Sequence, residues 1–307
     1  QSTGGMTPFA FRERGDSLVA SSLMRLILLI GCVAALPASA AFELSVSVLS
    51  PGSFTPTQYN QLQASLATAE AQWESVVTDY QPGINLTGIT IFVTANSPFA
   101  HADYPQTIVQ AGFTLSTFTS IGINPAVIDT YASWTGEGPL NPNPAYLGLN
   151  YLENILAHEI GHALGIGLLW EENNVYTPGT GQYLGKHGVR AYRAEFDPTA
   201  TSVPVEQAVS AAADLHWNQL LRSSSDEGNP SDPYSLSPLT GITDAQGRDL
   251  GMELLTGGLD ADYGKPFLSN TTIQSLRDLG FTVVPEPSSL ALAGLSLVGL
   301  VLRRRNG

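Results

Sequence analysis

Apolar positions in the first half of the chain recur with periods that predict strands and one long helix. Residues 42–49 alternate between apolar and polar side chains, as in a strand with one buried side. From Pro56 to about Tyr80 the apolar positions follow helical spacing, and residues 89–93 form a short β-branched run that predicts a buried strand. Between residues 97 and 144 the pattern weakens and Pro, Asn and Gly are frequent, so we expect only short or edge strands there.

A helix with a broad apolar face is predicted from residue 152 onward. Its apolar positions are Leu152, Leu156, Ile160, Ala163 and Leu164. Gly165 and Gly167 follow, and glycine allows the left-handed conformation that ends a helix. Later patterns predict, in order, a helix at 189–196, a compact turn at 251–257 and a last helix at 271–279, after which residues 281–284 close the fold.

The apolar helix carries three ionisable residues, His158, Glu159 and His162. Positions four apart share one face of a helix, so the two imidazoles can bind one zinc ion with bond lengths of about 2.0–2.1 Å. Glu159 lies at the flank of that face, where it can take a proton from a water on the metal. The alternative is a pair of structural histidines. Because burying three ionisable groups is costly and a dication compensates all three, we expect a metal site.

The third metal ligand cannot be chosen from spacing alone. The run from His158 to Gly165 resembles the metzincin signature, whose short form has a third His three residues after the glycine. That position is Leu168 here, so the third ligand lies further along the chain or the site is incomplete. The candidates are His216, His187 and Asp260, the last in a segment that resembles half of the aspzincin motif. His101 is expected to be a loop or surface residue.

The composition excludes some classes of function. The chain has 307 residues, enough for one sizeable domain, and a formal net charge of −14. It has no basic patch, so nucleic-acid binding is not expected, and the acidity favours solubility. The single cysteine, Cys32, excludes an intramolecular disulfide.

The N-terminal part of the chain predicts an export signal. Residues 1–23 have no clear pattern and are expected to be an upstream segment that is not native, with the natural start at Met24. Residues 24–40 have a positive start, an apolar run and an A-x-A cleavage site, as in a signal peptide. A lipobox-like run that ends at Cys32 leaves lipidation as an alternative.

The C-terminal residues 285–307 have the layout of a second targeting signal. A Pro-Glu-Pro start precedes a short apolar segment at 289–302 and three arginines from Arg303. The apolar segment is shorter than the roughly 20 residues of an ordinary membrane span. The arginines are typical of the positively charged residues that flank a membrane segment on its cytoplasmic side. This layout resembles the PEP-CTERM sorting tail of exported bacterial proteins. The resemblance implies export across the inner membrane to the envelope or the exterior, contact with the membrane at least transiently, and an exosortase-type sorting enzyme as partner.

A set of landmarks in a fixed order extends the resemblance to the body of the chain. After the HExxHxxG run come residues 191–193 (AYR), 203–206 (VPVE), 216–217 (HW), 253–257 (ELLTG) and 275–280 (SLRDLG). Over residues 42–284 this order resembles the leishmanolysin-like zinc metallopeptidases. The resemblance implies an α+β, metzincin-type catalytic domain at residues 41–284. It would have a twisted mixed sheet, an active-site helix and a mostly irregular C-terminal lobe.

The same resemblance implies that His216 is the third zinc ligand, because in that family the His before Trp binds the metal after a large insertion. The chain departs from the family pattern at Leu255, which stands where the turn under the metal carries a methionine. A leucine can fill the same apolar volume at small cost.

These features predict a secreted or envelope-associated zinc endopeptidase that acts on protein or peptide substrates. One catalytic Zn²⁺ would be held by His158, His162 and His216, with Glu159 as the general base.

The alternative is an extracellular, polysaccharide-associated binding protein that keeps zinc only for structure. A structural site would need a fourth protein ligand, such as Asp260 or His187. A calcium ion near Asp244 or Asp260 is supported by no motif, and the oligomeric state is left open.

Overall fold

The computed structural model describes residues 42–135, 147–207, 213–218, 240–258, 261 and 264–285. The chain divides into residues 1–39 and 40–307, and all described residues belong to the second part. The predicted signal peptide at 24–40 with Cys32, the apolar tail segment at 289–302 and the candidate ligand Asp260 lie outside the described residues.

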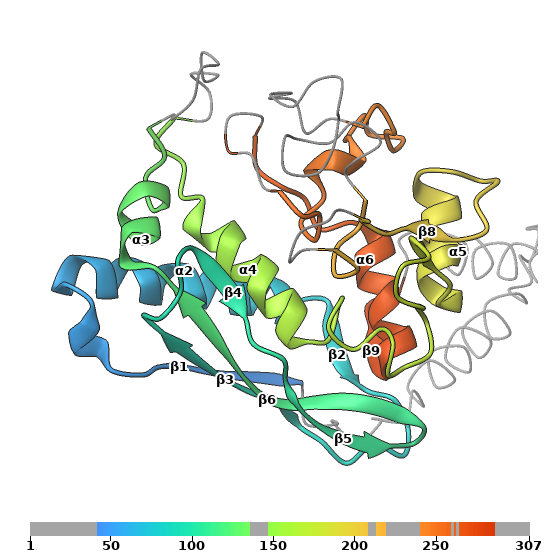
Figure 1. Ribbon diagram of the computed structural model, residues 1–307, viewed down its shortest axis with the longest axis horizontal. Helices are drawn as coiled ribbons and strands as arrows, with labels where there is room; N and C mark the ends of the chain where they lie inside the picture. Colours follow the sequence, from blue (N-terminus) through green and yellow to red (C-terminus); the bar gives the residue numbers. More distant parts are fainter. Residues whose placement is uncertain are drawn as a thin grey trace, which may run out of the picture. The chain divides into compact units, whose positions relative to one another are not determined.

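Most described strands lie in the first half of the chain, and short helices dominate the second half (Figure 1). The strands are β1 (Glu43–Val48), β2 (Val77–Tyr80), β3 (Gly88–Thr94), β4 (Ala100–Ala102), β5 (Gln106–Gln110), β6 (Phe113–Ile123), β7 (Gln182–Tyr183), β8 (Val203–Pro204) and β9 (Phe281–Val283). The helices are η1 (Pro51–Ser53), α2 (Pro56–Glu74), α3 (Pro125–Tyr131), α4 (Leu152–Ala163), α5 (Lys186–Glu195), η3 (Leu250–Met252), α6 (Asn270–Ser275) and η5 (Leu276–Leu279).

A mixed sheet forms one layer of the fold. Its strands lie in the order β1, β3, β6 and β4. β1, β3 and β6 run parallel, whereas β4 and β5 each pair antiparallel with β6. Helices α2 and α4 lie over the same face of this sheet (Figure 1). Alternate residues of β3 face this layer and are fully buried with apolar residues of both helices in one core.

Helix α2 begins at a capping box and ends six residues earlier than its pattern predicts. The Thr55 hydroxyl accepts from the backbone N–H of Gln58, whose side chain accepts in return from the Thr55 backbone. The prediction that this helix reaches Tyr80 is wrong, because residues 77–80 form β2, the antiparallel partner of β9. The partner strand lies some 200 residues further along the chain, so periodicity within the segment does not reveal it.

Residues 97–144 are more ordered than their pattern predicts. β6 has 11 residues and lies inside the sheet, with β3 on one side and β4 and β5 on the other. Threonines and serines at alternate positions obscure its apolar side in the sequence. Helix α3 follows, with Asn124 accepting from the Ala126 N–H at its start. The expectation of only short or edge strands is therefore wrong for β6.

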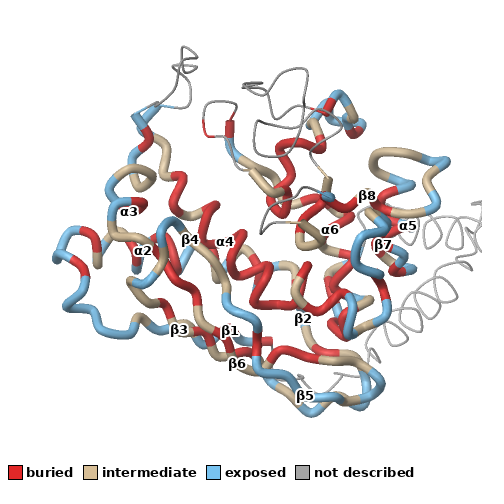
Figure 2. Tube along the Cα trace, in the orientation of Figure 1, coloured by how far each residue is buried: buried red, intermediate tan, exposed pale blue. Residues whose placement is uncertain are grey.

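Helix α4 is buried along its length (Figure 2), and only Glu153 of its 12 residues is not fully buried. It ends in a Schellman motif at Gly165, whose φ is 104°. The Gly165 N–H donates to the His162 carbonyl at 2.8 Å, and the Ile166 N–H donates to the Gly161 carbonyl at 3.1 Å. The predicted glycine exit from this helix is confirmed.

The C-terminal part consists of short elements whose ends are capped by distant carboxylates. Asp278 accepts from the backbone N–H groups of His187 and Gly188, so α5 begins at Lys186 and not at the predicted residue 189. Glu195, at the end of α5, accepts in turn from the N–H groups of Asn270 and Thr271 at the start of α6. The predicted last helix is present as α6 followed by η5.

Candidate metal centre

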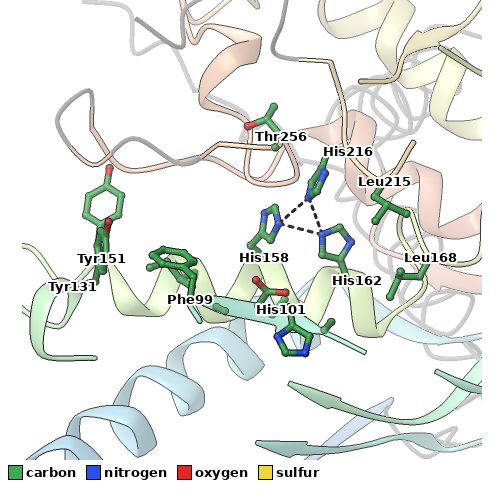
Figure 3. Close-up of a pocket in the computed structure, with 15 residues that line it drawn as sticks. Phe99, His101, Tyr131, Tyr151, His158, His162, Leu168, Leu215, His216 and Thr256 are labelled. Carbon is green, nitrogen blue, oxygen red and sulfur yellow. Dashed lines mark hydrogen bonds between the residues drawn. The ribbon is translucent and has the colours of Figure 1, made fainter. Parts of the chain in front are cut away.

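Three histidines from two distant segments converge at one point. His158 and His162 project from the same face of α4, and His216 approaches from the segment 213–218 (Figure 3). The Nε2–Nε2 distances are 3.1 Å between His158 and His162, 3.2 Å between His158 and His216, and 3.0 Å between His162 and His216. Within the described residues this is the single group of three His, Cys, Asp or Glu side chains close enough to share an ion.

His216 reaches α4 because its backbone is held on both sides. Its carbonyl accepts from the Glu206 N–H at 3.0 Å, and the N–H of the next residue, Trp217, donates to the Leu255 carbonyl at 3.0 Å. A Cβ at Gly167 would lie 2.2 Å from the Leu215 carbonyl oxygen, so only glycine allows these two segments of the chain to approach this closely. The second glycine after α4 therefore lets the His216 segment lie against the helix.

The hydrogen bonds of two histidines leave their Nε2 atoms without a proton. His158 donates from Nδ1 to the Leu254 carbonyl at 2.7 Å, and His162 donates from Nδ1 to the Ile166 carbonyl at 2.9 Å. Burial lowers the pKa of His158 well below its usual range, helped by the two neighbouring histidines, and burial also lowers the pKa of His162. Both rings are therefore neutral at pH 7, with Nε2 lone pairs directed at each other.

The arrangement of these three nitrogens is suited to binding a metal ion. Lone pairs 3 Å apart repel each other unless a cation lies between them. Tetrahedral coordination with Zn–N bonds of about 2.0–2.1 Å separates ligand nitrogens by about 3.3–3.4 Å, close to the spacing seen here. Neutral imidazoles with Nδ1 bonded to backbone carbonyls are the usual ligands of zinc. The residues present thus fit the predicted ion.

Glu159 lies beside the three histidines and is buried, with 6% of its surface exposed. Burial raises its pKa to about 8, while the backbone N–H of Ala102 in β4, which donates to the carboxylate, acts in the opposite direction. A dication at the histidines would stabilise the charged form of this carboxylate. The described geometry gives Glu159 a fixed hydrogen-bond donor on one side and the cleft on the other.

A cleft of about 310 Å³ exposes the edges of all four residues. Ala100, His101 and Ala102 of β4 form one wall. Aromatic side chains lie at one end of the cleft and leucines at the other (Figure 3): Phe99, Tyr131 and Tyr151 at the first end, Leu168 and Leu215 at the second. Leu168, the position of the third His in short metzincins, is therefore a wall residue.

The remaining candidates lie elsewhere or have other partners. His187 belongs to α5, outside the group of three. The half-exposed His101 bonds Ser97 Oγ at 2.9 Å and lies 3.3 Å from an Asp103 oxygen. Asp244 accepts from the N–H groups of Gln246 and Arg248 and pairs with the Arg248 side chain, so its carboxylate closes its own turn.

An apolar floor lies under α4 at the level of the histidines. Leu255 is fully buried, as expected for the residue in the methionine position. A Cβ at Gly161 would lie 2.9 Å from Leu255 Cδ1 and 3.0 Å from Trp73 Cζ2, so both side chains press on the helix backbone between the two histidines. Sequence reasoning identified Leu255 but missed the supporting roles of Ala102, Gly167 and Trp73, for which periodicity carries no signal.

Comparison with known families identifies the C-terminus. Residues 283–305 match the PEP-CTERM protein-sorting motif, which confirms the predicted sorting tail. The motif implies export, sorting to the envelope or the exterior, and recognition by an exosortase-type enzyme. No curated protein and no solved structure matches the chain. None of the helices in the described part of the chain is long and apolar enough to cross a membrane.

Proposed function

We propose that this exported protein is a zinc-dependent endopeptidase with a metzincin-type fold. The observation that carries the proposal is the convergence of three histidine Nε2 atoms and one buried carboxylate on the same cleft. A structural zinc site has four protein ligands, whereas a catalytic site has three and remains open. The described residues supply three ligands beside a cleft, which favours catalysis over a structural role.

The chain's own residues divide the work of peptide hydrolysis between them. Zinc, when bound, supplies the Lewis acid that activates a water molecule and polarises a carbonyl. Glu159 would take the proton of the attacking water on its carboxylate and pass it to the leaving amine. The Ala102 N–H holds that carboxylate in place during both transfers. The Leu254 and Ile166 carbonyls hold the two helix histidines in the tautomer that leaves Nε2 free to coordinate.

The edge strand β4 indicates an extended peptide as substrate. Asp103 N–H donates to the Ser120 carbonyl and Asn124 N–H to the Phe99 carbonyl, so odd-numbered residues of this segment face β6. The backbone groups of Ala100 and Ala102 therefore point away from β6, along the cleft wall. Ala102 uses its N–H to hold Glu159, and Ala100 would pair with the substrate backbone as an added strand.

The two ends of the cleft favour apolar side chains in the substrate. Phe99 and Tyr131 lie at one end, and Leu168 and Leu215 at the other. Among the described lining residues the ionisable groups are Glu159 and the histidines, together with tyrosine hydroxyls. We therefore expect cleavage between residues whose flanking side chains are aromatic or aliphatic, and poor cleavage next to acidic ones.

The order of landmarks supports the same proposal. The residues that resemble leishmanolysin-like metallopeptidases at 203–206 and 253–257 form the two segments that hold His216 and Trp217. Those at 191–193 and 275–280 lie in α5 and in α6–η5, which pack together behind these segments.

The test compares the purified protein with Glu159→Gln for bound zinc and for hydrolysis of casein. The amide keeps an oxygen that can accept from Ala102 but cannot take a proton. We expect about one zinc per chain in both proteins and a fall in hydrolysis of about 10²–10⁴-fold in the variant. Glu171→Gln, at an exposed acid beyond α4, is the matched control and should keep full activity.

Other outcomes separate the competing functions. Zinc bound without hydrolysis by the unchanged protein, and lost on Asp260→Ala, would favour a structural four-ligand site. An absence of zinc binding would contradict both readings.

A further inference from the structure

Glu253 is a buried carboxylate outside the cleft, and both of its oxygens accept hydrogen bonds. It is 0% exposed. One oxygen accepts from the Leu255 N–H at 2.6 Å. The other accepts from the Ser269 N–H at 3.1 Å, the Ser269 hydroxyl at 2.9 Å and the Thr272 hydroxyl at 2.5 Å. Burial raises the pKa of Glu253 to about 7, while these four donors, three of them on one oxygen, favour the ionised acceptor form.

The first branch of this network leads to His158. The bond from Leu255 N–H to Glu253 closes a tight turn over residues 253–255. The Leu254 carbonyl lies within that turn and accepts from His158 Nδ1 at 2.7 Å. The orientation of the carbonyl, and with it the ring of His158, depends on the turn that Glu253 closes.

The second branch leads to His216 through its neighbour. Thr272 Oγ1, which donates to Glu253, accepts from Trp217 Nε1 at 2.7 Å. The Trp217 N–H also donates to the Leu255 carbonyl at 3.0 Å, on the same turn. Trp217 is thus connected to Glu253 twice: its indole N–H through the Thr272 hydroxyl, and its backbone N–H through Leu255. Because Trp217 directly follows His216, both connections fix the backbone beside that ligand.

We infer that Glu253 is a positioning residue for the metal centre, which sets the orientation of His158 and His216 through these two branches. The inference rests on the zinc site of the proposed function, but it concerns affinity for the ion and not hydrolysis. Replacing Glu253 with Gln puts an amide N–H₂ against one set of its donors, so at least one branch loses its acceptor.

Glu195, the last residue of α5, offers a matched control because it also bonds to the start of α6. Glu195 is also largely buried, with 9% of its side chain exposed, and accepts from the Asn270 N–H, the Thr271 N–H and the Thr271 hydroxyl at 2.8–3.0 Å. It caps α6 as Glu253 does, but no described bond connects it to a histidine. Glu195 also pairs with Arg248 at 3.5 Å, so Glu195→Gln reports the cost of disturbing the start of α6 and this ion pair without a bond to a ligand.

The experiment measures zinc affinity by chelator competition for the full chain, Glu253→Gln and Glu195→Gln, with the visible spectrum of the cobalt-substituted proteins. We expect Glu253→Gln to bind zinc about 10–100-fold more weakly and to change the cobalt spectrum. Glu195→Gln should lower the melting temperature of the metal-free protein while its zinc affinity stays within about threefold of the unchanged protein.

A second variant keeps the test decisive if Glu253→Gln does not fold. Thr272→Val has nearly the same volume and removes the hydroxyl between Glu253 and Trp217, so it breaks the side-chain anchor of the His216 branch and leaves the His158 branch unchanged. Unchanged zinc affinity in Thr272→Val together with unchanged affinity in any folded Glu253→Gln would overturn the inference, as would equal losses in Glu253→Gln and Glu195→Gln. The expected affinity pattern without any hydrolysis would remove the peptidase proposal and leave Glu253 in its role. A full chain that binds no zinc would overturn both.

Discussion

Gly161, the residue between Ile160 and His162, is a glycine because two large side chains occupy the space of a Cβ. Leu255 comes from the turn under the helix and Trp73 from α2, and both would lie within 3.0 Å of that atom. The Trp73 ring cannot easily move aside, since its Nε1 donates to the Ala157 carbonyl at 2.7 Å. A residue that looks like a weak point of the helix therefore allows its closest packing.

Gly161→Ala should destabilise the protein despite the better helix propensity of alanine. The propensity gain is up to about 1 kcal/mol, and overpacking of a tight core costs about 1–3 kcal/mol. We expect a net loss of about 1 kcal/mol in the free energy of unfolding, measured by urea denaturation of the metal-free protein. Gly52→Ala is the control, because a Cβ there meets nothing within 4 Å. Unchanged stability of Gly161→Ala would mean that Leu255 and Trp73 both relax at little cost.

At the scale of elements, α4 is held by both α2 and the 253–257 turn. The bond from Trp73 to Ala157 spans the two helices one turn before Gly161 and is fully buried. Hydrogen bonds from Gly165 and Ile166 to carbonyls of α4 close its C-terminus. The histidines therefore project from a helix whose position depends on neighbours at both ends of the sequence.

Trp73→Phe should loosen this helix pair. The phenyl ring keeps much of the apolar volume but removes the donor to Ala157, and losing a buried hydrogen-bond partner costs about 1–3 kcal/mol. We expect a melting temperature lower by several degrees, measured by circular dichroism. Gln63→Ala on the same helix removes an exposed bond to Tyr59 and should change stability by less than about 0.5 kcal/mol. Equal effects of the two changes would contradict the proposed importance of the α2–α4 bond.

For the whole molecule, the buried histidines predict that the free energy of unfolding depends on pH. The folded-state pKa values of His158 and His162 are lowered, mainly by burial, whereas in the unfolded chain they are about 6.5. Below that pH the unfolded chain binds protons that the folded protein excludes. The two histidines should therefore lower the free energy of unfolding of the metal-free protein as the pH falls through 6.5. Glu159 acts in the opposite direction, because its raised pKa of about 8 lets the folded protein hold a proton that the unfolded chain releases.

The measurement is urea denaturation in the presence of chelator between pH 5 and 8. His162→Gln should reduce the slope of stability against pH, because it removes one of the two buried histidines. A slope that His162→Gln does not alter would show that other groups dominate the acid response.

The sequence by itself determined the features that depend on neighbours a few residues apart. The i, i+4 spacing places His158 and His162 on one face of α4, and Gly165 marks where that helix ends. The sorting tail could also be recognised from the sequence, because its proline, apolar and arginine segments are contiguous. Such features follow from local geometry and need no knowledge of the fold.

Only the tertiary structure decided which distant groups complete the centre. Residue spacing left His216, His187 and Asp260 as alternatives, and the family resemblance implied His216. The structure brings His216 to the other two histidines across 54 residues. It also replaces the predicted end of α2 by β2, pairs β2 with β9, and gives Glu159 a partner in β4. These contacts arise from packing between segments far apart in the chain. The pattern of apolar and polar residues within either segment alone does not show which distant segment it will pack against.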